Sequence, residues 1–229
     1  MFVGRVMHRE LITVTPDTPM VKARKLIAEK RIHHLLVVNP NGGLVGILSD
    51  RDIRQSWASP ATSLSTHELN YLLSQITVDM VMIRKIVTIP PDTTIERAAQ
   101  IMQENRISAL PVVEDDKPRG IITTTDVMGV LLEAIGIDRG ETTRFVVLVE
   151  WDRIGVISGM TQVLKEEEIN IRSIFCWPDR DHKGVTHIVL RVAAENAEQS
   201  VAALRKAGYQ VLTEYVADLE PHLPSRQTG

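Results

Sequence analysis

Two short stretches of the sequence place a hydroxyl side chain three residues before an aspartate. In each, a glycine precedes an aliphatic run, and the stretches cover Gly46 to Asp52 and Gly120 to Asp126. At a strand-to-helix junction, free N–H groups and partial positive charge suit a phosphate. An aspartate in the first turn can accept hydrogen bonds from two vicinal ribose hydroxyls. The same residues are also typical helix caps, so the spacing alone leaves both roles open.

The two stretches differ in their basic residues. The first adds Arg51, a fixed cation that can bond to phosphate, and is preceded by His33 and His34. The second has Thr125, Ser108 and Ala109 at the matching places. The histidines could equally be exposed residues at a strand edge. We predict that the first stretch is the phosphate-competent one.

These stretches belong to a duplicated unit. A shift of 75 residues aligns Val3, Val6, Met7 and Arg9 with Val78, Val81, Met82 and Arg84, and the agreement continues for about fifty positions. Each copy predicts the order β-α-β-β-α, and one copy is too small to stand easily alone. The predicted helix starts are Thr18 as N-cap before Pro19, and Thr93 with Glu96 as a capping box.

The remaining sequence divides around these copies. We place the first repeat at 1–60, a connecting loop and helix at 61–77, and the second repeat at 78–136, ending at a helix cap on Gly136. Residues 143–217 predict the order βαββαβ of a ferredoxin-like unit, with a helix closing at Gly208 and a last strand over Tyr209 to Val216. Residues 218–229 are polar and predicted to be disordered. The fold class is therefore α+β.

Composition excludes several classes of protein. The net charge of −3, from 26 basic and 29 acidic side chains, is too balanced for a nucleic-acid binder. No apolar run is long enough to span a membrane, and Arg5 interrupts the N-terminus where a signal peptide needs an apolar core. With a single cysteine, Cys176, these features favour the cytoplasm.

One cluster could suggest catalysis or a metal. It comprises Cys176, Asp179, Asp181, His182 and His187, but most of it lies in a solvated hairpin loop. Outside it the sequence has no nucleophile–base pair. We predict no catalytic residues, no metal and no enzyme activity.

The repeat, with Arg31-Ile-His-His-Leu-Leu-Val-Val and Gly46-Ile-Leu-Ser-Asp-Arg-Asp-Ile, resembles a pair of CBS domains. The resemblance implies two clefts that bind an adenine nucleotide such as AMP, ADP or ATP. The hydroxyl would contact ribose or phosphate, and the aspartate would hold the ribose. The candidate residues are Ser49, Arg51, Asp52, His33 and His34 for one cleft, with Thr123 and Asp126 for the other.

The C-terminal unit resembles an ACT domain. Such domains commonly pair, and many bind amino acids at a turn whose residues here are Asp152, Ile154 and Gly155, with Asn170 opening the next strand. Many carry proline where this chain has Ile154, which favours a unit used for dimerisation over an amino-acid sensor.

The two modules together resemble the AcuB-type acetoin-utilization proteins. This implies a homodimeric regulatory protein that senses a nucleotide and controls acetoin or related carbon metabolism through an unknown target protein. The alternatives are a structural dimer that binds nothing and an amino-acid sensor acting through the ACT unit.

Overall fold

The computed structural model describes residues 1–56, 75–137, 140–150 and 154–224. Contacts divide the chain into two compact units, Met1–Met128 and Gly129–Gly229, and each is described by itself. The boundary falls inside one helix, α7 (Thr124–Ala134). In the 61–77 segment, where the sequence predicts a connecting loop and helix, residues 61–74 lie outside the described residues.

The first unit contains both repeats. The first repeat comprises α1 (Val3–Val6), β1 (Thr13–Val14), α2 (Met20–Lys30), β2 (His34–Val38), β3 (Leu44–Ser49) and α3 (Asp50–Ser56). The second comprises α5 (Val78–Val81), α6 (Ile95–Asn105), β4 (Ala109–Glu114), β5 (Lys117–Thr123) and the start of α7. β2 and β3 pair antiparallel, as do β4 and β5. The first strand of the second repeat is reduced to a single bridge between Ile89 and Val112.

Two predicted helix starts are wrong by one residue. Helix α2 begins after Pro19, because the Thr18 hydroxyl bonds to that of Thr15, 3.1 Å away, instead of capping the helix. Helix α6 is capped by Thr94, whose hydroxyl accepts from the Arg97 amide at 3.2 Å. In both repeats the helix therefore begins one residue later than the sequence pattern predicts.

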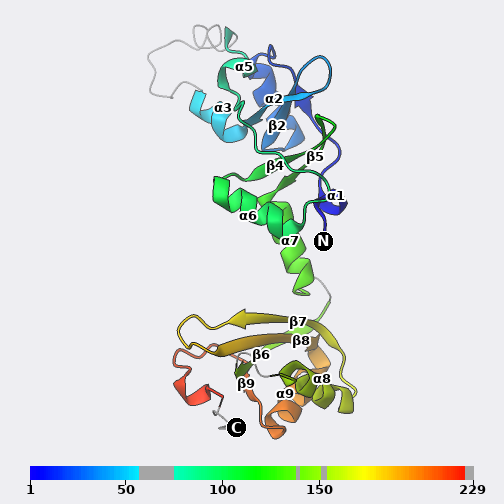
Figure 1. Ribbon diagram of the computed structural model, residues 1–229, viewed down its shortest axis with the longest axis vertical. Coiled ribbons are helices and arrows are strands. Elements are labelled where there is room, and N and C mark those ends of the chain that lie inside the picture. The colour runs from blue at the N-terminus through cyan, green and yellow to red at the C-terminus, as the bar shows by residue number, and fades with distance from the viewer. Residues whose placement is uncertain (57–74, 138–139, 151–153, 225–229) are drawn as a thin grey trace. The chain divides into compact units, whose positions relative to one another are not determined.

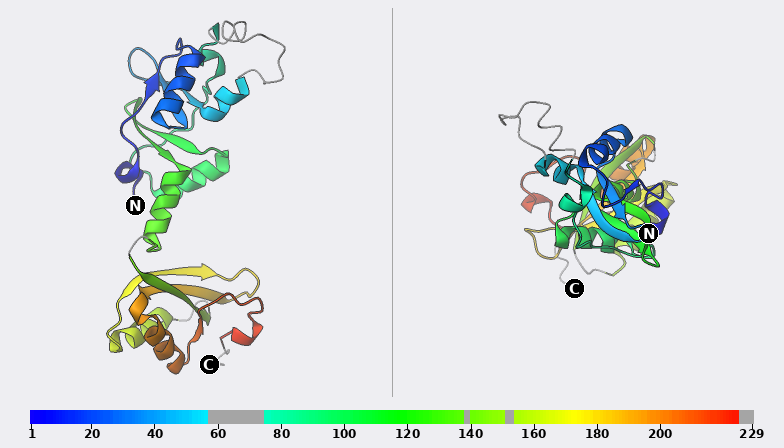
Figure 2. Two further views of the ribbon diagram at one scale, coloured as in Figure 1. Left: turned by 180° about the vertical axis from the view of Figure 1, so that it is seen from behind. Right: turned by 90° about the horizontal axis from the view of Figure 1, so that it is seen from above.

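The repeats exchange their first segments. Helix α1 bonds to the second repeat, through the Val3 amide to the Thr93 carbonyl at 2.8 Å, and it lies beside β5 in both views (Figures 1 and 2). Helix α5 bonds to the first repeat, through the Val78 amide to the Thr18 carbonyl at 2.9 Å. Each repeat is therefore completed by residues that belong to the other.

The exchange of α1 and α5 explains why the stretches Gly46 to Asp52 and Gly120 to Asp126 both start with glycine. A Cβ at Gly46 would overlap the sulfur of Met82, which follows α5, and a Cβ at Gly120 would overlap the sulfur of Met7, which follows α1. Both methionines are buried. The bare glycine backbone thus lets the exchanged segment approach the strand closely.

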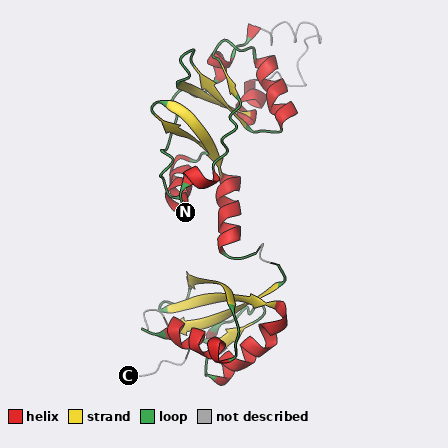
Figure 3. Ribbon diagram, turned by 90° about the vertical axis from the view of Figure 1, so that its right-hand side faces the viewer, coloured by secondary structure: helices red, strands yellow, loops and turns green. Residues whose placement is uncertain are grey.

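The second unit is a four-stranded sheet covered on one face by helices. Its elements are β6 (Thr142–Glu150), α8 (Val156–Glu166), β7 (Ile171–Pro178), β8 (Val185–Ala193), the 3₁₀ turn η1 (Ala194–Asn196), α9 (Ala197–Lys206) and β9 (Gln210–Leu212). The strand order is β7-β8-β6-β9, and Figure 3 shows α8 and α9 together on one face of the sheet. Phe145, Leu190, Met160 and Leu204 pack between the two layers. This is the predicted βαββαβ order.

Both predicted glycine caps are confirmed. Gly136 and Gly208 have φ of 76° and 88°, and each lies two residues after its helix. The Ile137 amide bonds to the Leu132 carbonyl at 3.2 Å, and the Tyr209 amide bonds to the Leu204 carbonyl at 3.0 Å. These hydrogen bonds, each spanning five residues, need a residue in the left-handed conformation, which glycine adopts without strain.

The C-terminus differs from its prediction. β9 ends at Leu212 and not at Val216. In the segment expected to be disordered, the 3₁₀ turn η2 (Glu220–His222) forms, and Leu219 packs with Val146, Leu148 and Val189 on the second face of the sheet. The apolar side chain buries part of this face, which composition alone did not indicate.

Candidate functional site

The residues of the first stretch form one hydrogen-bonded group at the junction of β3 and α3. The Ser49 amide and hydroxyl both donate to Asp52 Oδ2, at 2.8 and 2.6 Å. The Asp52 amide lies 3.2 Å from the Ser49 Oγ that accepts from it. This is a reciprocal helix cap. Among the described residues, nothing donates to the other carboxylate oxygen, Asp52 Oδ1.

The second stretch repeats this group at the junction of β5 and α7. The Thr123 amide and hydroxyl donate to Asp126 Oδ2, both at 2.7 Å. Here the second oxygen is also engaged, because His8 Nε2 lies 2.8 Å from Asp126 Oδ1. The Asp126 side chain is 16% exposed, whereas that of His8 is 64% exposed. His8 comes from the exchanged segment after α1.

Sequence reasoning missed His8. Its amide and carbonyl pair with Ile121 of β5, just as those of Ile83 pair with Ile47 of β3. The 75-residue shift places His8 opposite Ile83, so the two sites differ in this residue. The alignment of the two copies contained a signal, because the polar His8 aligns with the aliphatic Ile83 next to the matched methionines. Its meaning depended on the exchange of segments.

The histidines of the first repeat lie next to its group. His34 is the β2 partner of Ser49 in the strand register, and the His33 carbonyl accepts from the Asp50 amide at 3.0 Å. Burial lowers the pKa of His34, and the charge of Asp50 opposes that shift. His34 Nε2 also lies 3.3 Å from the hydroxyl of Ser108, the second repeat's counterpart of His33.

The charged residues beside Asp52 are mostly paired. Asp50 lies 3.0 Å from Arg54 and 3.5 Å from the ring of His33. Arg51 is exposed, and in the described parts of the chain it has no ion pair.

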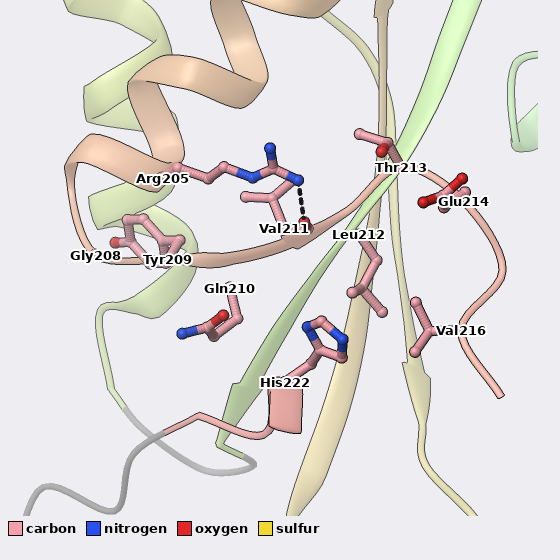
Figure 4. Close-up of a pocket in the computed structure, with 10 residues that line it drawn as sticks. All are labelled: Arg205, Gly208, Tyr209, Gln210, Val211, Leu212, Thr213, Glu214, Val216 and His222. Carbon is pink, nitrogen blue, oxygen red and sulfur yellow. Dashed lines mark hydrogen bonds between the residues drawn. The ribbon is translucent and has the colours of Figure 1, made fainter. Parts of the chain in front are cut away.

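The predicted residues of the second unit are scattered. Gly155 caps α8 with φ of 86°, Ile154 is 99% exposed, and Asn170 is exposed just before β7. Asp152 lies outside the described residues. None of the three described residues lines the pocket of about 440 Å³ beside β9. That pocket has polar walls that include Tyr209, Gln210 and His222, and the Arg205 guanidinium donates to the Val211 carbonyl at 2.9 Å (Figure 4).

Part of the Cys176 cluster comes together around Asp179. His187 Nε2 lies 2.6 Å from Asp179 Oδ2, and His182 Nδ1 lies 3.0 Å from Oδ1. The His187 hydrogen bond and the His182 amide hold the pKa of Asp179 well below its usual range, against the effect of burial. Cys176 is exposed on β7. Within the residues described, no group of three such side chains could hold a metal ion.

Comparison with known proteins identifies the repeats. Residues 3–59 and 78–133 match the CBS domain, and residues 143–208 match the ACT domain. A CBS domain-containing protein of Dictyostelium discoideum is 31% identical over 135 residues, 58% of this chain and 92% of that protein. The chain belongs to the CBS-domain family. Its two CBS domains form the first unit, and an ACT domain follows them.

Two further similarities extend this result. A homoserine O-acetyltransferase of Methanococcoides burtonii is 35% identical over 127 residues, 55% of this chain but 23% of the enzyme. The crystal structure of AcuB from Vibrio cholerae, a protein assigned to acetoin utilization, has 25% identity and a TM-score of 0.50. That match covers 61% of this chain and 96% of AcuB. CBS and ACT domains are regulatory modules, not catalytic ones.

No helix among the described residues is both long enough and apolar enough to cross a membrane.

Proposed function

We propose that this protein is a non-catalytic sensor whose CBS pair binds an adenine nucleotide. The observation that carries the proposal is the open acceptor oxygen of Asp52. Ser49 fixes the carboxylate by bonding to Oδ2, and among the residues that the structure describes nothing donates to Oδ1, the oxygen that we assign to a ligand. A fixed carboxylate with one oxygen open suits the vicinal hydroxyls of a ribose.

Neighbouring residues supply the rest of the proposed site. Arg51 is the cation for the phosphate of AMP, ADP or ATP, because a guanidinium makes charge-assisted bonds to phosphate oxygens. His33 and His34 flank the same junction. Thr123 and Asp126 form the equivalent second site, which has Thr125 in place of Arg51.

Two substitutions test this assignment by calorimetric titration with adenosine, AMP and ATP. Asp52→Ala is expected to weaken all three by a similar factor of about ten, the size of a hydrogen bond to a charged group. Arg51→Ala is expected to spare adenosine and to weaken AMP about tenfold, and ATP at least as much. It should also flatten the salt dependence of AMP binding.

Because Asp52 also caps α3, the titration needs a control for lost stability. Thr94→Ala removes the cap of α6 at a similar cost of about 1 kcal/mol and should leave binding unchanged. If Arg51→Ala binds AMP as tightly as the parent, Arg51 is not in the site. Absence of binding by any adenine-containing ligand at millimolar concentration would overturn the sensor proposal.

We assign the ACT unit to self-association, because β7 is an edge strand of its sheet and can pair with a second copy. The likeness to AcuB supports acetoin or related carbon metabolism as the process under control. An amino acid bound near Ile154 and Gly155 is the competing role. Titration with the twenty common amino acids tests it.

A further inference from the structure

The two sites differ in how many acceptor positions their aspartates leave open. A carboxylate offers about four lone-pair positions, two on each oxygen. In both sites Oδ2 accepts two hydrogen bonds from the amide and hydroxyl of Ser49 or Thr123. Within the described residues, both acceptor positions of Asp52 Oδ1 are free, whereas one acceptor position of Asp126 Oδ1 is occupied by the hydrogen bond from His8.

This difference decides how many ribose hydroxyls each aspartate can bind. Its 2′- and 3′-hydroxyls need two acceptor positions to bind together. Asp52 can take both, because Ile83, the counterpart of His8, has no polar side-chain atom. Asp126 can take one while His8 holds Oδ1. The His8 ring is mostly exposed, but its 2.8 Å contact must break before a second hydroxyl binds.

We propose that His8 determines the sugar specificity of the second site: with His8 in place, that site does not distinguish a ribonucleoside from its 2′-deoxy form, whereas the first site does. The inference rests on the proposed function, because it takes the aspartates to be the ribose-binding groups. It makes the two sites of one chain receptors for different ligands. The first selects intact ribose, and the second tolerates a nucleoside with one hydroxyl missing.

The test compares adenosine with 2′-deoxyadenosine, which carry no phosphate and so do not engage Arg51. Each site is measured in the full chain while the other is weakened, the first site in Asp126→Ala and the second site in Asp52→Ala. The first site is expected to prefer adenosine about tenfold, the size of one hydrogen bond to a charged group, and the second less than about threefold. Adding His8→Ile to the second-site protein should raise its preference to about tenfold.

The reciprocal change gives an independent arm. Ile83→His, placed in the first-site protein, should reduce its preference for adenosine toward that of the second site. His8→Gln keeps a donor at this position and should behave as the parent, while His8→Ala should behave as His8→Ile if the isoleucine variant does not fold. Thermal unfolding of each variant checks that the fold is retained.

The outcomes separate the two proposals. If adenosine binds but His8→Ile and His8→Ala leave the preference unchanged, or lower the affinity, His8 does not set specificity and this inference falls alone. If the second site already prefers adenosine as strongly as the first, it falls as well. If adenosine binds at neither site, the nucleotide-sensor proposal fails and takes this inference with it.

Discussion

At the scale of single residues, one partly buried carboxylate of the ACT unit, that of Asp179, gathers several hydrogen bonds. Asp179 accepts hydrogen bonds from the rings of His187 and His182 and from the amides of Asp181 and His182. His182 Nε2 also lies 3.6 Å from Glu220 of η2. His182, held by Asp179, therefore links the β7–β8 hairpin to the C-terminal segment.

This network predicts an acid-dependent loss of stability. Because the folded state holds the pKa of Asp179 below its ordinary value of 3.8, ionised Asp179 stabilises the fold above that pH. The contribution is lost as the pH falls below it. Asp179→Asn should lower the free energy of unfolding by about 1–3 kcal/mol near neutral pH. The difference from the parent should shrink below about pH 4, because the unfolded parent chain then binds a proton at this carboxylate while the folded chain keeps it ionised.

Urea unfolding monitored by circular dichroism from about pH 7 down to pH 3 measures this effect. The matched control is Asp181→Asn, two residues away in the same loop and exposed. It should change stability by less than about 0.5 kcal/mol. An equal effect of the two substitutions, or a difference independent of pH, would contradict the role given to Asp179.

At the scale of elements, the exchange of α1 and α5 predicts crossed effects of substitution. Met82 belongs to the second repeat but is buried in the core of the first, against Gly46 of β3. Met82→Ala should therefore cost about 2–3 kcal/mol and should accelerate amide exchange most in β3. Met7→Ala should act on β5 in the same way. Met80, which is 69% exposed, supplies the control, and Met80→Ala should be nearly neutral.

Hydrogen exchange resolved by residue distinguishes the exchanged arrangement from a simple arrangement in which each repeat is completed by its own first segment. In the simple arrangement Met82→Ala would loosen β5 and spare β3. That pattern would show that α5 does not complete the first repeat.

At the scale of the whole molecule, exposed apolar surface predicts self-association. Met128, Leu131 and Leu132 are 55%, 48% and 36% exposed, and their spacing places them on one face of α7. Apolar side chains grouped on a helix face mark interaction sites, and most soluble oligomers are symmetric dimers. We expect a homodimer of twice 25.6 kDa.

Light scattering after size exclusion measures this mass directly. Leu131→Glu should weaken the dimer without abolishing it, because the partner would have to bury a charge on the α7 face while the β7 contact remains. Glu133→Lys, an exposed neighbour on the same helix, should leave the mass unchanged. A parent mass of 25.6 kDa across the micromolar range would exclude the homodimer.

Much of this protein could be predicted from the sequence, because the deciding signals are local or repeated. The duplication, the βαββαβ order and the glycine caps at Gly136 and Gly208 follow from identity, periodicity and backbone conformation. The pairing of Ser49 with Asp52 also follows, since three residues separate a helix cap from the side chain that bonds to it.

Tertiary structure alone decided which segment completes which repeat. Exchanged and closed arrangements bury the same valines and methionines, so hydrophobic pattern does not separate them. His8 and Asp126 are 118 positions apart, and no short-range rule connects them. The packing of Leu219 on the sheet was hidden for the same reason, because an isolated apolar residue in a polar tail has no periodicity. Local chemistry was therefore readable in the sequence, whereas the difference between the two sites depended on contacts between distant segments.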